Sequence, residues 1–134
     1  MQDMSEVSIA DLSARVRSER SLVVVFFVAT WENGECCHDA RPLFDALRDG
    51  GEAAREFCGA RRYSVCGLGS SAPRYLGTYQ RAARDLTAML AANGGVAVCD
   101  MGEEDEQVPI CRHPPTLKSL PLCYQHLKSL QLCC

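Results

Sequence analysis

The chain has 134 residues, 47% of them apolar and 23% charged, and its formal net charge is −3. This length suits about one domain, and no apolar run reaches the length of a membrane-spanning helix. The N-terminus lacks the apolar core of a signal peptide, and the acidic balance argues against nucleic-acid binding through a basic patch. We therefore predict a cytoplasmic protein that contacts neither membranes nor nucleic acids directly.

The nine cysteines do not predict a disulfide framework, because the chain shows no signal peptide. Cys66 and Cys99 lie in apolar stretches and are expected to be small core residues. Cys36, Cys37 and His38 are residue types that bind metals, but adjacent cysteines differ from the gapped pair of most zinc sites. A metal site at these three residues is the weaker alternative.

A short helix and a buried strand are predicted first. Ser8 and Asp11 form a capping-box-like pair, and apolar residues of the segment 8–20 share one helical face. Residues 22–29 are apolar throughout and rich in Val and Phe. This composition is typical of a strand that is covered on both faces of a parallel sheet.

Helices and strands continue to alternate along the chain. Pro42 is tolerated in a first helical turn, and Thr78 is a suitable helix cap. The remaining predicted elements are a helix at 39–51, ended by its two glycines, a loop at 50–60, a strand at 62–69, a helix at 78–95 and a short strand at 96–101. This alternation predicts an α/β fold with a parallel sheet and right-handed crossovers.

The last 27 residues differ in kind. Residues 117–126 and 127–134 are near-repeats, prolines interrupt any long helix, and residues 108–134 hold three of the 14 Lys and Arg but none of the 17 Asp and Glu. Two copies are too few for a repeat fold. We predict a domain at 1–107 followed by an irregular, low-complexity tail at 108–134.

Polar loops follow the three predicted strands at residues 30–38, 69–77 and 102–107. In a parallel sheet these loops meet at the carboxyl edge, where ligands of open α/β sheets bind. Trp31 and Tyr75 have rings on which a planar heterocycle can stack. Alternatively, Trp31 packs on the following helix and the loop glycines serve only as turn residues.

Three segments at these loops carry a family resemblance. They read ATWENGECCHDA at 29–40, YSVCGLGSSAP at 63–73 and DMGEED at 100–105. Across about residues 10–106 the chain resembles the flavodoxin-like FMN-binding domain of diflavin reductases and of flavodoxin-containing tRNA wybutosine-synthesis enzymes. The resemblance implies a flavodoxin-like three-layer sandwich, FMN as cofactor, and an electron-transfer module in which no residue acts as a general acid or nucleophile.

The resemblance also implies the cofactor-binding residues, with Trp31 in the position of a stacking tyrosine. These residues are Ala29, Thr30, Trp31, Glu32, Leu68, Gly69, Ser70, Ser71, Tyr75, Gly77 and Glu103. The implied partner is a redox protein or a fused domain, within a larger oxidoreductase or a tRNA-modifying flavoprotein.

One family feature has no counterpart in the sequence. The family begins with a strand, a phosphate loop of the type S/T-x-T-G-T and a helix, and the chain contains no match to that loop. We therefore expect an incomplete fold and weak or absent FMN binding. The alternative function is a non-redox remnant that acts in protein–protein interaction through the sheet edge that a missing strand exposes.

Overall fold

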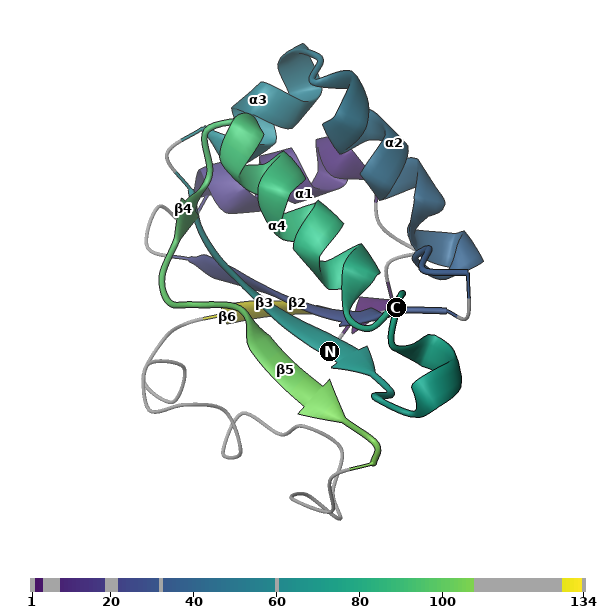
Figure 1. The fold of residues 1–134 in the computed structure, drawn as a ribbon. Helices are drawn as coiled ribbons and strands as arrows, with labels where there is room; N and C mark the ends of the chain where they lie inside the picture. The colour runs from purple at the N-terminus through teal and green to yellow at the C-terminus, as the bar shows by residue number, and fades with distance from the viewer. Residues whose placement is uncertain are drawn as a thin grey trace.

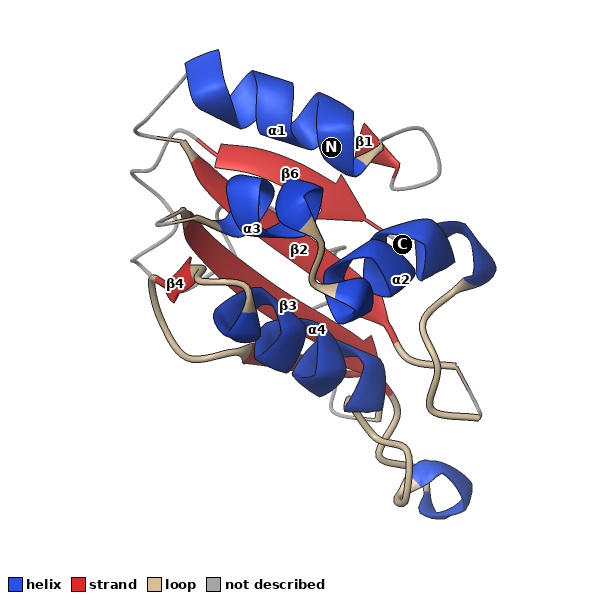
Figure 2. Ribbon diagram, turned by 90° about the horizontal axis from the view of Figure 1, so that it is seen from above, coloured by secondary structure: helices blue, strands red, loops and turns tan. Residues whose placement is uncertain are grey.

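The computed structural model describes residues 2–3, 8–18, 22–31, 33–59, 61–107 and 129–133. They form a parallel six-stranded sheet, and four helices lie over one of its faces (Figures 1 and 2). The helices are α1 Ile9–Ser18, α2 Arg41–Asp49, α3 Glu52–Cys58 and α4 Arg81–Ala92. The strands are β1 Gln2–Asp3, β2 Val23–Ala29, β3 Arg62–Gly69, β4 Val96–Ala97, β5 Gly102–Asp105 and β6 Ser129–Cys133.

The strand order is β1-β6-β2-β3-β4, and β5 pairs with the second half of β3. Every pairing is parallel, with Phe26 opposite Val65 in the centre of the sheet. The predicted α/β fold with a parallel sheet is confirmed. As a result, β2, β3 and β5 all end at the same edge.

Strand β2 is buried on both faces, as its apolar sequence predicts. Val24, Phe26 and Val28 belong to the main core together with buried residues of all four helices. Val23 and Phe27 belong to a second cluster on the opposite face. A strand that is covered on both sides has no polar position along its length, which explains the unbroken apolar run.

Several predicted boundaries are confirmed and others shift. The Ser8 hydroxyl donates to Asp11 Oδ2 over 2.6 Å, and the Asp11 backbone N–H donates to Ser8 Oγ over 3.1 Å, which confirms the cap of α1. Gly50 ends α2 with a φ of 62°. Helix α4 begins at Arg81 instead of Thr78, because residues 76–80 form turns.

The prediction of a loop at residues 50–60 is wrong, because helix α3 occupies most of this segment. Ala54, Phe57 and Cys58 are buried against the core. A helix of seven residues has too few turns for its apolar spacing to stand out in the sequence. The strand predicted at 96–101 is also shorter, since β4 contains only Val96 and Ala97.

The structure also departs from the tail predicted at 108–134. Ser129–Cys133 forms β6, which pairs with β2 on one side and β1 on the other. The edge of β2 is therefore paired, whereas we expected a missing strand to leave a sheet edge exposed. Residues 108–128 and Cys134 lie outside the described residues.

None of the helices in the described part of the chain combines the length and the apolar character needed to cross a membrane.

Candidate functional site

The first loop at the carboxyl edge presents an exposed tryptophan. The Thr30 backbone N–H donates to the Leu68 carbonyl oxygen over 3.1 Å, which ties the end of β2 to the end of β3. A tight turn follows, in which the Gly34 N–H donates to the Trp31 carbonyl oxygen over 2.8 Å and the Trp31 N–H donates to the Glu35 carbonyl oxygen over 2.9 Å. Trp31 remains 56% exposed. More than half of its side chain is therefore accessible at this edge, and Trp31 is not a core residue.

Thr30 carries an unusual hydroxyl. Its Oγ1 atom is buried and has no hydrogen-bond partner among the described residues. A buried polar group without a partner costs free energy, and such groups are uncommon in folded proteins. A bound ligand would satisfy this hydroxyl once the groups that cover Oγ1 move aside.

Gly34 brings the first and second loops into contact. It is buried and has a φ of +83°, which side chains rarely adopt. A Cβ at this position would lie 2.9 Å from Arg81 Cδ and 3.1 Å from Thr78 Cγ2. Only glycine allows the two loops to approach this closely.

The second loop contains the 3-10 helix Pro73–Tyr75 and the turns that precede α4. The Thr78 N–H and hydroxyl both donate to the Tyr75 carbonyl oxygen. The guanidinium carbon of Arg74 lies 4.6 Å from the centroid of the Tyr75 ring, a cation–π contact. This contact occupies one face of the ring, so any planar ligand stacked on Tyr75 would use the other.

The end of β5 is joined to the second loop through Asp105, the last residue of that strand. Its Oδ1 atom accepts hydrogen bonds from the backbone N–H groups of Ser71 and Gln107, each over 3.0 Å. Hydrogen bonds from the Ser71 side chain and from these two N–H groups lower the pKa of the Asp105 carboxyl. The Glu106 N–H also donates to the Gly69 carbonyl oxygen over 3.0 Å. The first two loops and the segment 102–107 therefore lie side by side, as predicted, but residues 102–105 of this segment form β5 instead of a loop.

Gln80, which directly precedes α4, holds the ends of β3 and β5 together. Its side chain is fully buried, and Nε2 donates to the carbonyl oxygens of Gly67 and Glu104 over 3.2 and 3.0 Å. These bonds connect β3, β5 and the start of α4. Gln80 has a φ of 57°, a left-handed conformation that is uncommon outside glycine.

The structure brings most of the predicted site residues to this edge. Ala29 ends β2 and is followed by Thr30 and Trp31, while Leu68 and Gly69 end β3 and are followed by Ser70 and Ser71. Tyr75 and Gly77 lie in the second loop. Glu32 lies outside the described residues.

Glu103 is placed differently from the prediction. It lies within β5 instead of a loop, and its carboxylate is 3.7 Å from an Arg84 guanidinium nitrogen of α4. The acid that joins the loops is Asp105, two residues later. Asp105 and Gln80 were not predicted as site residues, and in the sequence only the four-residue acidic run from Glu103 to Glu106 pointed to Asp105.

The cysteines of the first loop do not form a metal cluster. Cys36 is buried, and burial is the main cause that raises the pKa of its thiol. His38 is exposed at the start of a 3-10 helix. Within the described parts of the chain, no three His, Cys, Asp or Glu residues are grouped so that they could hold a metal ion.

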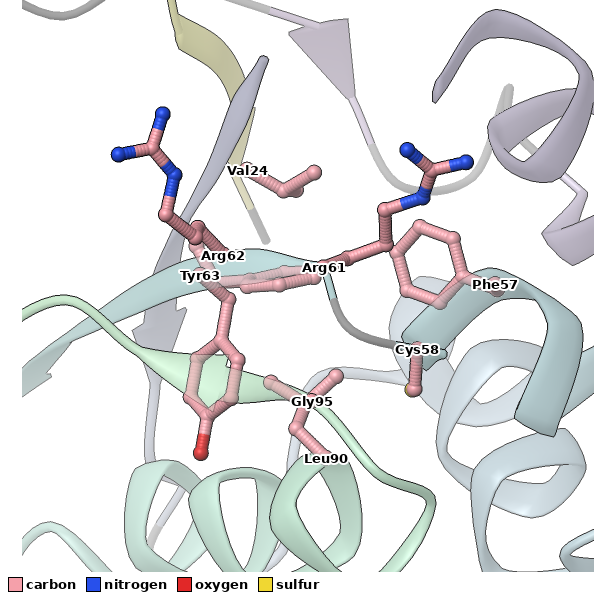
Figure 3. Close-up of a pocket in the computed structure, with 9 residues that line it drawn as sticks. Val24, Phe57, Cys58, Arg61, Arg62, Tyr63, Leu90 and Gly95 are labelled. Carbon is pink, nitrogen blue, oxygen red and sulfur yellow. The ribbon is translucent and has the colours of Figure 1, made fainter. Parts of the chain in front are cut away.

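A small apolar cavity lies near the opposite end of the sheet (Figure 3). Val24 and Tyr63, the second residues of β2 and β3, contribute to its lining together with Phe57 and Leu90. Its space suits about one water molecule, and burial raises the pKa of the neighbouring Cys58 thiol to about 11. The cavity belongs to the core and is not continuous with the loops at the carboxyl edge.

Comparisons with known proteins agree with this fold. The family model described as flavodoxin matches residues 2–110. A flavodoxin of Pseudomonas aeruginosa, solved as a cysteine-to-serine mutant, superimposes with a TM-score of 0.55 at 20% sequence identity. The match covers 70% of this chain and 59% of that flavodoxin, so the chain spans less than two thirds of its length. No curated protein sequence matches the chain.

Proposed function

Because the chain belongs to the flavodoxin family, we propose that its carboxyl edge holds the isoalloxazine ring of a flavin between the first and second loops. Flavodoxins bind FMN and pass electrons to partner proteins. When bound, the flavin supplies the electron transfer, and the protein positions the ring and tunes its surroundings. We assign this role to the loops around Trp31 and Tyr75.

The observation that carries the proposal is the pairing of an exposed indole with an unsatisfied hydroxyl. Trp31 is 56% exposed and directly follows Thr30, whose buried Oγ1 has no partner among the described residues. A flavin ring has an aromatic face for the indole and polar edge atoms for the hydroxyl. Both features lie where ligands of open α/β sheets bind.

Backbone groups add to this candidate site. The turn at residues 31–35 and the segment at Ser70 and Ser71 flank the ends of β2 and β3. The fixed, ionised carboxylate of Asp105 holds the Ser71 N–H in place. We propose that the same contact keeps the second loop in a single position against the ring.

The phosphate end of FMN fits less well. No S/T-x-T-G-T segment is present in the sequence, and the described residues near this edge include the acids Glu103, Glu104, Asp105 and Glu106. Negative charges disfavour a phosphate. We therefore expect residues 1–134 to bind FMN weakly and with little preference over riboflavin, which has the same ring and no phosphate.

The wider role extends the same proposal. We propose that the module comprises residues 1–107 together with β6, works in the cytoplasm, and passes electrons to a redox partner or fused domain. A larger oxidoreductase or a tRNA-modifying flavoprotein is the context we favour. The alternative is a non-redox interaction domain that binds a partner through an exposed sheet edge. This alternative is less well supported, because β6 pairs with β2 at that edge.

Titration of the 134-residue chain with riboflavin and with FMN, followed by quenching of flavin fluorescence, tests the proposal. We expect saturable quenching by both ligands with similar affinities. Absence of quenching by either flavin at millimolar protein would refute ring binding. A large preference for FMN would show that the phosphate is held after all.

A further inference from the structure

The C-terminal strand β6 occupies an interior position in the sheet. Leu132 and Cys133 pair with Gln2 and Asp3 of β1, and all five residues of β6 pair with residues 23–27 of β2. Figure 2 shows β6 between β1 and β2. Among the described strands, β6 is the only neighbour of β1, so it connects β1 to the rest of the sheet.

Strand β6 reaches this position from a distance in sequence. β5 ends at Asp105 and β6 begins at Ser129, so 23 residues, 106–128, connect them. The strand order 2-1-3-4-5 of flavodoxin-like sheets places the first strand of the chain between the second and the third. Here the same interior position, next to the central strand β2, is filled by the last strand in the sequence.

The sequence offers two candidates for this position. Residues 117–123 read LKSLPLC and residues 127–133 read LKSLQLC, so the two copies differ only at Pro121 and Gln131. Proline lacks a backbone N–H and has a fixed φ near −65°, and it is found essentially only on edge strands or at bulges. β6 lies inside the sheet, so the copy with glutamine suits the position and the copy with proline does not.

We propose that the gap between β1 and β2 is a strand-acceptor site, and that the second repeat copy occupies it because Gln131 replaces the proline of the first copy. The partner that fits this site is an extended segment in parallel orientation with the sequence of residues 127–133. Backbone pairing with β2 provides the affinity. The occupant acts as a tethered ligand of the same chain.

Hydrogen exchange on the intact chain tests the occupancy. We expect backbone amides within 129–133 to exchange at least about tenfold more slowly than in a free peptide, because strand pairing protects them. Amides within 119–123 should lack this protection. Free-peptide exchange rates at 129–133 would overturn the proposal.

Two variants test the selection by proline. In Gln131→Pro, protection at 129–133 should disappear. In the double variant Pro121→Gln/Gln131→Pro, protection should move to 119–123, and the fold should be restored if the single variant unfolds. Unchanged protection at 129–133 in the single variant, or failure of the double variant to transfer it, would contradict the proposal.

A peptide added in trans tests the acceptor directly. A fluorescent peptide LKSLQLC should bind the Gln131→Pro chain, while the matched peptide LKSLPLC should not. The unaltered chain should bind LKSLQLC at least about tenfold more weakly, because its own tethered copy competes at an effective concentration on the order of millimolar. Equal binding of the two peptides, or no binding of LKSLQLC to the folded variant, would refute a strand-acceptor site.

Discussion

The side chain of Gln80 occupies the space that any side chain at Gly67 would need. Gln80 Nε2 donates to the Gly67 carbonyl oxygen over 3.2 Å, and a Cβ built at Gly67 would overlap the Gln80 amide. It would also approach Ala83 Cβ to 2.9 Å. β3 and the start of α4 are therefore in direct contact just below the three loops.

This contact predicts that Gly67→Ala destabilises the protein by about 1–3 kcal/mol, the usual cost of overpacking a buried site. Denaturant unfolding followed by circular dichroism measures the change. Gly77→Ala is the matched control, because no atom of the described residues lies within 4 Å of a Cβ at that position. Its effect should stay within about 0.5 kcal/mol, and equal losses in both variants would contradict the packing argument.

Trp31→Ala should weaken flavin binding without changing stability. Aromatic stacking contributes about 0.5–1.5 kcal/mol, which corresponds to about a 2- to 12-fold increase in Kd. Fluorescence titration with riboflavin gives the ratio of affinities.

The control for Trp31 is Val96→Ala, which shortens another exposed apolar side chain at the opposite end of the sheet. Val96 is 52% exposed. This variant should bind riboflavin with unchanged affinity. If the Trp31→Ala variant also keeps full affinity for riboflavin, the indole does not contribute to the proposed site.

Thr30→Val separates ligand binding from stability. The substitution removes a buried hydroxyl that has no partner among the described residues, and keeps a side chain of similar shape. We expect the free energy of unfolding to remain equal or to rise, because an unsatisfied polar group is lost. We expect riboflavin affinity to fall. A marked loss of stability would show that the hydroxyl is satisfied within the protein.

The lowered pKa of Asp105 predicts how the stability of the fold depends on pH. Its pKa in the folded protein lies below the ordinary value of 3.8, because Ser71 and Gln107 donate hydrogen bonds to its carboxylate. The folded state therefore favours the ionised form. This contribution is present above about pH 4 and is lost as the pH falls through the folded pKa.

Asp105→Asn should accordingly reduce the loss of stability between about pH 5 and about pH 2. Unfolding curves measured at intervals across this range give the comparison. Glu106→Gln removes one acidic charge from the same loop and serves as the control. An Asp105→Asn chain with the acid sensitivity of the unaltered protein would count against this role.

Much of the fold was predictable because local patterns and the final structure agree. The apolar run at 22–29 predicted a strand buried on both faces, and β2 is such a strand. The Ser8 and Asp11 pair predicted the cap of α1. In both cases neighbouring residues alone carry the signal.

The candidate site was predictable only in outline. Parallel topology predicted that the three loops gather at one edge, and contacts at Gly34 and Asp105 show that they do. Gln80 could not be recognised, because a glutamine before a helix gives no sign that it will be buried. Its role depends on the absence of a side chain at Gly67, 13 positions earlier in the chain.

By itself the sequence determined the alternation of helices and strands, the parallel direction of the sheet and the edge at which its loops gather. These follow from side-chain periodicity and from the geometry of parallel crossovers. Only the tertiary structure decided that Trp31 stays exposed, that the Thr30 hydroxyl lacks a partner among the described residues, and that a segment of the tail enters the sheet. Each of these depends on contacts between residues far apart in the chain. A five-residue strand such as β6 is too short for its sequence pattern to predict the strand with which it pairs.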